Sequence, residues 1–74
     1  MNLLNNLNPG DFAIINAVHA EQSLAQRLVA MGFRAGKKIK LIRRANFNGP
    51  LHVRIGTTDV ILRESEAKLI QISH

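Results

Sequence analysis

The chain contains no cysteine, no tryptophan and no tyrosine in its 74 residues. The missing cysteines exclude a disulfide framework, a thiol nucleophile, a zinc ribbon and a cysteine-ligated cluster. Since a secreted domain of this size would usually need disulfides, we expect a cytoplasmic protein. The N-terminal residues lack the basic start and the long apolar stretch of a signal peptide. The longest apolar runs, Phe12–Ile15 and Leu28–Met31, are far too short to span a bilayer.

Acidic residues are also scarce, because the chain has only five. All of them fall in turn or surface contexts, so a pair of catalytic carboxylates is not expected. No serine has the setting of a nucleophile elbow. The segment from Gly32 to Lys38 looks like a phosphate-binding loop, but its glycines are one residue too close. In addition, Lys38 stands where a serine or threonine would bind magnesium. The sequence therefore predicts no enzyme activity.

Basic residues dominate instead, and ten lysines and arginines give a net charge of +5. Six of them fall in one stretch with no acid between them. This basic run consists of Arg34, Lys37, Lys38, Lys40, Arg43 and Arg44. Such a run can be a solvated strand face that keeps a small barrel soluble and discourages edge pairing. It can also attract phosphates, anionic lipid headgroups or an acidic protein surface.

One short α-helix is expected at about residues 23–31. Ser23 and Gln26 have the spacing of a capping box. An apolar stripe with helical spacing follows, formed by Leu24, Leu28 and Met31 and widened by Ala25 and Val29. Gly32 comes next, where a helix favours a residue with positive φ to close its last carbonyls.

The rest of the chain consists of about five short strands, which predicts a mostly β, closed or nearly closed small barrel. The strand at Phe12–Val18 is apolar on both faces, so we expect the helix or the N-terminal segment to cover its outside. Ile42 interrupts an alternating strand and predicts a bulge. Asn48-Gly49 predicts a hairpin turn. The leucines near the N-terminus predict a lid or helical turn over one end of the barrel.

Metal ligation has four candidates, His19, Glu21, His52 and His74. His19 and Glu21 are close in sequence, but two ligands do not make a selective site. His52 is expected on the outer face of a strand. We therefore expect no metal site and no cofactor, and a direct metal carrier is the weakest alternative function.

A nucleic-acid-binding barrel is the main alternative, because the basic run could follow a phosphate backbone. Barrels that bind single strands usually add stacking aromatic residues. The chain has three phenylalanines. We expect Phe12 and Phe33 in the core, and only Phe47, in the hairpin turn, on the surface. The basic half of the signature is present and the stacking half is nearly absent, so nucleic acid ranks second as a partner.

The order of several short motifs resembles the FeoA family. These motifs are Leu-x-x-Leu-x-Pro-Gly from Leu4 to Gly10, Arg27-Leu28-x-x-Met31-Gly32-Phe33, Gly36, Asn48-Gly49-Pro50-Leu51, Leu62-Arg63 and Glu66-Ala67-x-x-Ile70. Individual pieces are weak, but their order and spacing together are specific. One departure is Ala35, where the family pattern often has proline before the glycine.

The resemblance implies an SH3-like small β-barrel that spans residues 1–74 as a single domain. It also implies a non-enzymatic, cytoplasmic accessory or regulatory role in ferrous iron uptake. The implied partner is FeoB, a membrane transporter with a cytoplasmic GTP-binding region. The resemblance supplies no catalytic residue.

Contact with that partner is expected to use the basic run for electrostatic steering and apolar side chains as anchors. The predicted partner-binding residues are Arg34, Lys37, Lys38, Lys40, Arg43, Arg44, Phe47 and Leu51. The groove beside the helix is a further candidate anchor.

Overall fold

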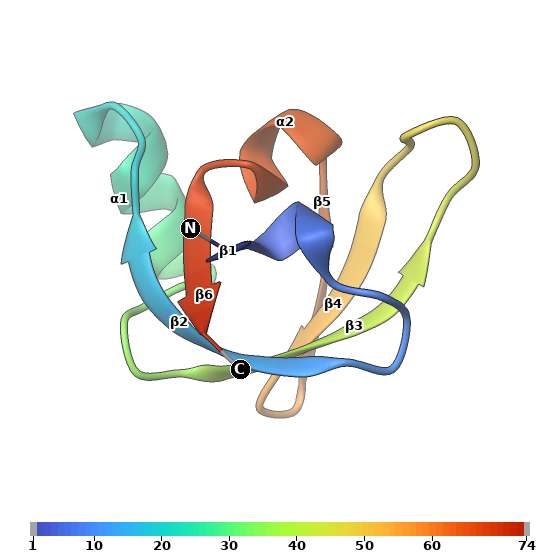
Figure 1. Cartoon of the computed structure of the whole chain (residues 1–74). Coiled ribbons are helices and arrows are strands. Elements are labelled where there is room, and N and C mark those ends of the chain that lie inside the picture. Colours follow the sequence, from blue (N-terminus) through green and yellow to red (C-terminus); the bar gives the residue numbers. More distant parts are fainter. Residues whose placement is uncertain (1, 74) are drawn as a thin grey trace.

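The computed structural model describes residues 2–73, which form a six-stranded antiparallel sheet that curls around one hydrophobic core (Figure 1). Along the chain the elements are β1 (Asn2–Leu3), the 3₁₀ helix η1 (Leu4–Asn6), β2 (Phe12–Val18), α1 (Gln22–Ala30), β3 (Lys38–Arg44), β4 (Leu51–Ile55), β5 (Thr58–Leu62), α2 (Glu64–Ala67) and β6 (Ile70–Ser73). The strands lie side by side in the order β1-β6-β2-β3-β4-β5. The mostly β architecture is therefore as predicted. The strand beyond the expected five is β1, whose two residues are too few to give a pattern.

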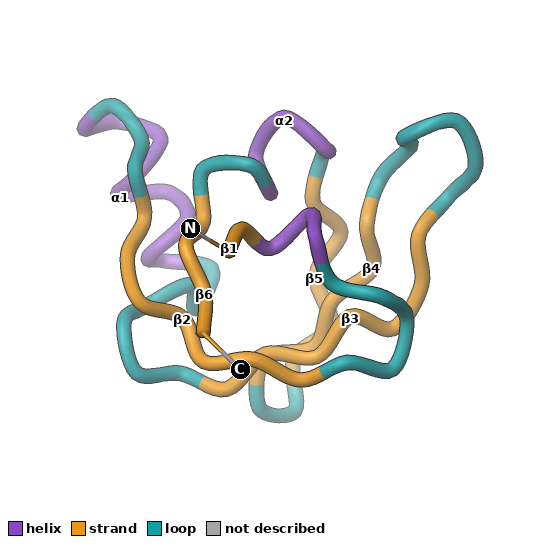
Figure 2. Tube along the Cα trace, viewed as in Figure 1, coloured by secondary structure: helices purple, strands orange, loops and turns teal. Residues whose placement is uncertain are grey.

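The N-terminal leucines form the predicted helical turn over one end of the core. Leu4, in η1, and Leu7 are both buried. Figure 2 shows the strands surrounding the middle of the molecule, with η1 and α2 next to each other. Burial of a leucine side chain is worth roughly 1.5–3 kcal/mol, so these two residues hold the segment down. Within residues 2–73, no helix is long and apolar enough to cross a membrane.

Helix α1 begins one residue earlier than predicted, because Glu21 caps it. The Glu21 carboxylate accepts hydrogen bonds from the backbone N–H groups of Ser23 and Leu24. The predicted cap at Ser23 is therefore wrong, since a charged acceptor two residues upstream already satisfies these donors. Leu28 is fully buried, but Val29 is 40% exposed and does not widen the buried stripe as predicted.

Strand β2 is buried on one face only. Ala13 and Ile15 point into the core, whereas Phe12 and Ile14 are 49% and 40% exposed. The prediction that another segment covers the outside of β2, with Phe12 in the core, is wrong. Phe33 supplies the aromatic core residue instead, and it is fully buried as predicted. The result is an uncovered outer sheet face with exposed apolar side chains.

Strand β3 contains the predicted bulge at Ile42, where the register with β4 shifts between Leu41 and Arg43. The turn of the β3–β4 hairpin lies one residue earlier than predicted. Its positive φ angles fall at Phe47 (59°) and Asn48 (57°), not at Asn48 and Gly49. The glycine has a different role: a Cβ at Gly49 would lie 2.8 Å from the Ala45 Cβ, so the two arms of the loop can approach only at a glycine.

Candidate partner-binding surface

The bulge in β3 decides which basic side chains share a face of the sheet. Before the bulge, Lys40 lies opposite Arg54 of β4, and after it Arg43 lies opposite His52. His52 and Arg54 are two residues apart on one strand, so they point to the same side. Lys40 and Arg43 therefore share that outer face, although their positions are three apart in the sequence. An unbroken strand would have placed them on opposite faces.

Arg44 falls on the other side of the same strand, where it stabilises the fold. One Nη donates hydrogen bonds to the backbone oxygens of Asn5 (2.7 Å) and Leu7 (2.9 Å). The other donates to Glu64 Oε2 at 3.2 Å. These bonds tie η1 and α2 to the sheet. Arg44 is one of the predicted partner-binding residues, but both of its terminal nitrogens already donate hydrogen bonds within the chain.

Leu51 is fully buried and cannot touch a partner, so its prediction as an anchor is wrong. The reason is the alternation of β4, in which Leu51, Val53 and Ile55 point into the core. Leu51 pairs across the sheet with buried Leu62. Leu51 is therefore a core residue.

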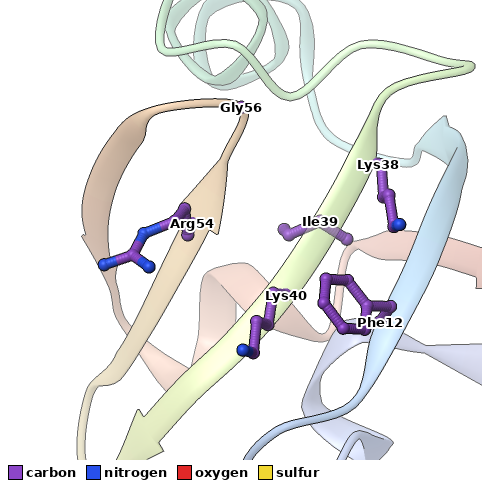
Figure 3. Close-up of a pocket in the computed structure, with 6 residues that line it drawn as sticks. All are labelled: Phe12, Lys38, Ile39, Lys40, Arg54 and Gly56. Atoms are coloured by element: carbon purple, nitrogen blue, oxygen red, sulfur yellow. The ribbon is translucent and has the colours of Figure 1, made fainter.

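Two lysines of the basic run meet an aromatic ring on the outer face. The Phe12 ring of β2 has the Lys38 Nζ 4.4 Å and the Lys40 Nζ 5.0 Å from its centroid. Cation–π contacts at exposed sites contribute about 0.5–1 kcal/mol each. The three side chains border a shallow pocket of about 260 Å³ between β2 and β4. Figure 3 shows the residues that line it, which are Phe12, Lys38, Ile39, Lys40, Arg54 and Gly56.

Sequence reasoning missed Phe12 as a surface residue. Phe12 lies opposite Lys40, and Ile14 lies opposite Lys38. This pairing places two apolar side chains beside two ammonium groups. The only sequence signal is that Phe12 alternates with small Ala13, which allows either of the two to face the core. The register that joins Phe12 to Lys40 is not visible in the sequence.

Asp59 neutralises part of the positive charge on the same face. The Arg54 Nε donates to Asp59 Oδ1 at 2.7 Å, and an Arg54 Nη donates to Oδ2 at 3.1 Å. The His52 Nε2 lies 2.9 Å from the same Oδ2. These hydrogen bonds, first from Arg54 and then from His52, lower the pKa of Asp59 to about 2. Asp59 is therefore ionised at neutral pH and balances Arg54, whose guanidinium points away from Phe12 (Figure 3).

The remaining basic residues lie away from the pocket. Arg34 and Lys37 are exposed in the connection between α1 and β3. Arg34 lines a second shallow hollow, over the outer face of α1, with Val29. Of the predicted basic contacts, the structure therefore brings only Lys38 and Lys40 together around an apolar side chain.

Phe47 is fully exposed at the tip of the β3–β4 hairpin, as predicted. Its φ of 59° lies in the left-handed region, which bulky side chains rarely adopt. An exposed aromatic residue with a strained backbone is a feature that stability alone does not favour. It is separate from the Phe12 pocket, whose lining residues do not include it.

The two histidines that the structure describes, His19 and His52, have protein partners. His19 Nε2 lies 2.7 Å from Gln71 Oε1, and His52 contacts Asp59. In the part of the chain that the structure describes, no three metal-ligating side chains gather into one group. The fourth candidate, His74, lies outside the described residues.

Comparisons with known proteins cover nearly the whole chain. A model of the FeoA domain matches residues 2–74. The chain is 39% identical over 70 residues to an Fe(2+) transport protein A homologue of Campylobacter jejuni, with 95% of each chain covered. It is 33% identical over 69 residues to an Fe(2+) transport protein A/Fe(2+) transporter FeoB fusion protein of Porphyromonas gingivalis. That match covers 93% of this chain and 8% of the fusion protein.

A solved structure with the same fold is that of FeoA from Stenotrophomonas maltophilia complexed with zinc, described as a procaryotic SH3 domain protein. It is 30% identical to this chain, with a TM-score of 0.86, and the match covers 99% of this chain and 91% of that one. The predicted SH3-like fold is thereby confirmed. The chain belongs to the FeoA family, which is associated with Fe(2+) transport.

Proposed function

We propose that this protein is a cytoplasmic, non-enzymatic accessory or regulatory protein of FeoB-dependent Fe(2+) uptake. It acts by contact with the cytoplasmic GTP-binding region of an FeoB-like transporter. The fusion protein of Porphyromonas gingivalis, in which a similar domain and the transporter share one chain, supports this pairing. Covalent linkage maintains a high effective concentration of one part near the other, which is useful when the two must touch.

The observation that carries the proposal is the uncovered outer face of the sheet, where Phe12 and Ile14 are exposed beside Lys38 and Lys40. Protein interfaces combine buried apolar or aromatic anchors with a charged rim. The lysines supply long-range attraction to an acidic surface, and the apolar side chains supply area that binding removes from water.

Phe47 is a second contact in this proposal. The Phe47 side chain is fully exposed at the hairpin tip, so folding removes little of its apolar surface from water. A partner that covers the ring would remove this surface from water and so favour binding. The left-handed backbone at Phe47 costs roughly 1 kcal/mol, and the presence of phenylalanine there is consistent with a use outside the fold. Arg43, on the outer face near this tip, and Arg34 and Lys37 at the opposite end, contribute steering at the rim.

The test measures binding of this chain to the complete FeoB-like transporter in nanodiscs, with and without GTP. A transporter that lacks its GTP-binding region serves as a control. Reversal of both pocket lysines, Lys38→Glu with Lys40→Glu, should weaken binding by about tenfold or more. The matched control reverses two exposed charges beside α2, Arg63→Glu with Lys68→Glu, and has the same net charge. No binding to the complete transporter, or equal binding when the GTP-binding region is removed, would refute the proposal.

A single-stranded nucleic acid is the second candidate, and the exposure of Phe12 favours it more than the sequence did. The two ammonium groups lie 4.4 Å and 5.0 Å from the centroid of the Phe12 ring, however, and they compete with a base, which needs a whole ring face to stack. Filter binding of single-stranded RNA and DNA at two salt concentrations separates the candidates. Submicromolar binding with a steep salt dependence would favour nucleic acid.

A further inference from the structure

We infer that the pocket around Phe12 recognises an acidic segment of a partner protein, in which carboxylates flank an apolar side chain. The carboxylates pair with Lys38 and Lys40, and the apolar side chain covers Phe12. The inference rests on the proposed function in that it names the chemistry of the segment that docks. It adds a defined site on the sheet and a ligand class to the general expectation of contact.

The first step is the state of the two lysines. The ion pairs within residues 2–73 join Arg27, Arg44, His52 and Arg54 to carboxylates, and none of them includes a lysine. Arg54 is the third cation at the pocket, but Asp59 balances it. The net positive charge at the pocket therefore comes from Lys38 and Lys40. Charge complementarity selects an anionic ligand.

The second step is the way in which the ring holds these charges. Both ammonium groups lie within 5.0 Å of the centroid of one ring, so a single short ligand can reach both of them. The long lysine side chains lose freedom on binding. Contact with the Phe12 ring already restricts them in the free protein, and this lowers the entropy lost when a ligand binds.

The third step is the apolar component, which a simple anion would leave unused. Phe12 presents about half of its surface to solvent, and Ile14 is its exposed neighbour on β2. Ile39 and Gly56 complete the lining, but the Ile39 side chain is fully buried in the core and adds no accessible apolar surface. An aliphatic side chain can lie on this surface between the two lysines. A carboxylate-rich segment without such a side chain should bind more weakly.

The experiment is a titration of the ¹⁵N-labelled full chain with a blocked pentapeptide of four glutamates around a central leucine. We expect saturable amide shifts centred on Phe12, Ile14, Lys38 and Lys40. Two comparison peptides separate the contributions: one replaces the glutamates by glutamines, and the other replaces the leucine by glycine. Loss of the charges should abolish binding at moderate salt, and loss of the leucine should weaken it about fivefold.

Variants locate the site. Phe12→Ala should weaken peptide binding at least about fivefold. Ile61→Ala is the matched control, because it removes another exposed apolar side chain, on β5 and outside the pocket lining, and it should bind the pentapeptide like the unmodified chain. Retained amide dispersion shows that each variant is folded. Equal loss in both variants, shifts centred away from the pocket, or indifference to Phe12→Ala would overturn the inference. Stronger binding of a single-stranded uridine octamer at the same amides would also overturn it.

Binding of the complete transporter separates this inference from the proposed function. If Phe12→Ala binds the transporter normally, the docking segment lies elsewhere and the inference fails while the proposed function stands. If the pentapeptide binds at Phe12 but the transporter does not bind the chain at all, the site stands and the proposed partner is wrong.

Discussion

The basic side chains at the two ends of strand β3 have different roles. At its start, Lys38 and Lys40 extend over an outer face and have no carboxylate partner among the described ion pairs. At its end, Arg44 turns inward and binds two backbone carbonyls and Glu64. The bulge at Ile42 shifts the register by one residue, so that Lys40 faces outward and Arg44 faces inward. A continuous basic stretch in sequence is thus divided into an exposed basic surface and an arginine that stabilises the fold.

The phenylalanines on either side of the sheet differ in the same way. Phe33 fills the core, and Phe12 lies on the outer face between two lysines. Residue type alone does not distinguish the two. Substitution of Phe33 should lower the stability of the fold, and substitution of Phe12 should mainly weaken binding.

The largest effect on stability should come from Phe33→Ala. Truncation of a fully buried phenylalanine costs about 3–5 kcal/mol, which is much of the stability expected for a domain of this size. Phe12→Ala should cost about 1–2 kcal/mol, because the ring is half exposed and its truncation removes two cation–π contacts. Urea unfolding of both variants checks this. Similar losses in the two variants would contradict the assignment of one to the core and the other to the surface.

A smaller effect should come from Arg44→Met, at about 2 kcal/mol. The variant leaves two carbonyl groups and Glu64 without a charged donor. Lys40→Met, on the same strand, should change the free energy of unfolding by about 1 kcal/mol or less, because it removes one exposed cation–π contact. Amide hydrogen exchange should quicken locally in residues 3–7 of Arg44→Met only. Equal stability of the two variants would mean that Arg44 is not a structural tie.

Substitution of Phe47 should act in the opposite direction. Phe47→Asn should stabilise the protein by about 0.5–1 kcal/mol, because asparagine tolerates the left-handed backbone found there. Phe47→Ala should change stability little, since alanine keeps the backbone strain. Thermal unfolding measures both. If alanine and asparagine have the same effect, the strain at this position does not contribute to stability.

The smallest effect should be a change in acid stability on Asp59→Asn. The pKa of Asp59 is lowered to about 2 in the folded chain, below the value of about 3.9 expected when unfolded. Its contribution is therefore fully present above pH 4 and is lost as the pH falls toward 2. The unmodified chain should lose stability more steeply than Asp59→Asn over this interval. Parallel pH profiles of the two proteins would show that the Arg54–Asp59 pair does not contribute.

Much of the fold could be predicted from local patterns. The bulge at Ile42 follows from a broken alternation, the end of α1 from Gly32, and the N-terminal helical turn from closely spaced leucines. The order of the short motifs identified the family. Each of these signals depends on neighbours within a few residues, and local sequence carries that information.

The candidate site depends on strand register and on contacts between distant segments, which local sequence patterns do not reveal. The exposure of Phe12 follows from where α1 does not pack, and its position beside Lys40 follows from the β2–β3 register. The inward turn of Arg44 follows from the bulge combined with the position of η1, almost forty residues earlier in the chain. The sequence predicts Phe12 in the core and Leu51 on the surface, and the structure has the reverse. An apolar residue at the start of a strand can face either side, and only the pairing of the whole sheet decides which.

The most direct test of the proposed docking is a titration of the ¹⁵N-labelled chain with the cytoplasmic GTP-binding region of an FeoB-like transporter. Amide shifts should centre on Phe12, Ile14, Lys38 and Lys40, should extend toward Phe47, and should weaken with salt. The buried positions around Arg44 should be unaffected. Shifts confined to the outer surface of α1, or no shifts in either nucleotide state, would contradict docking through the outer face of the sheet.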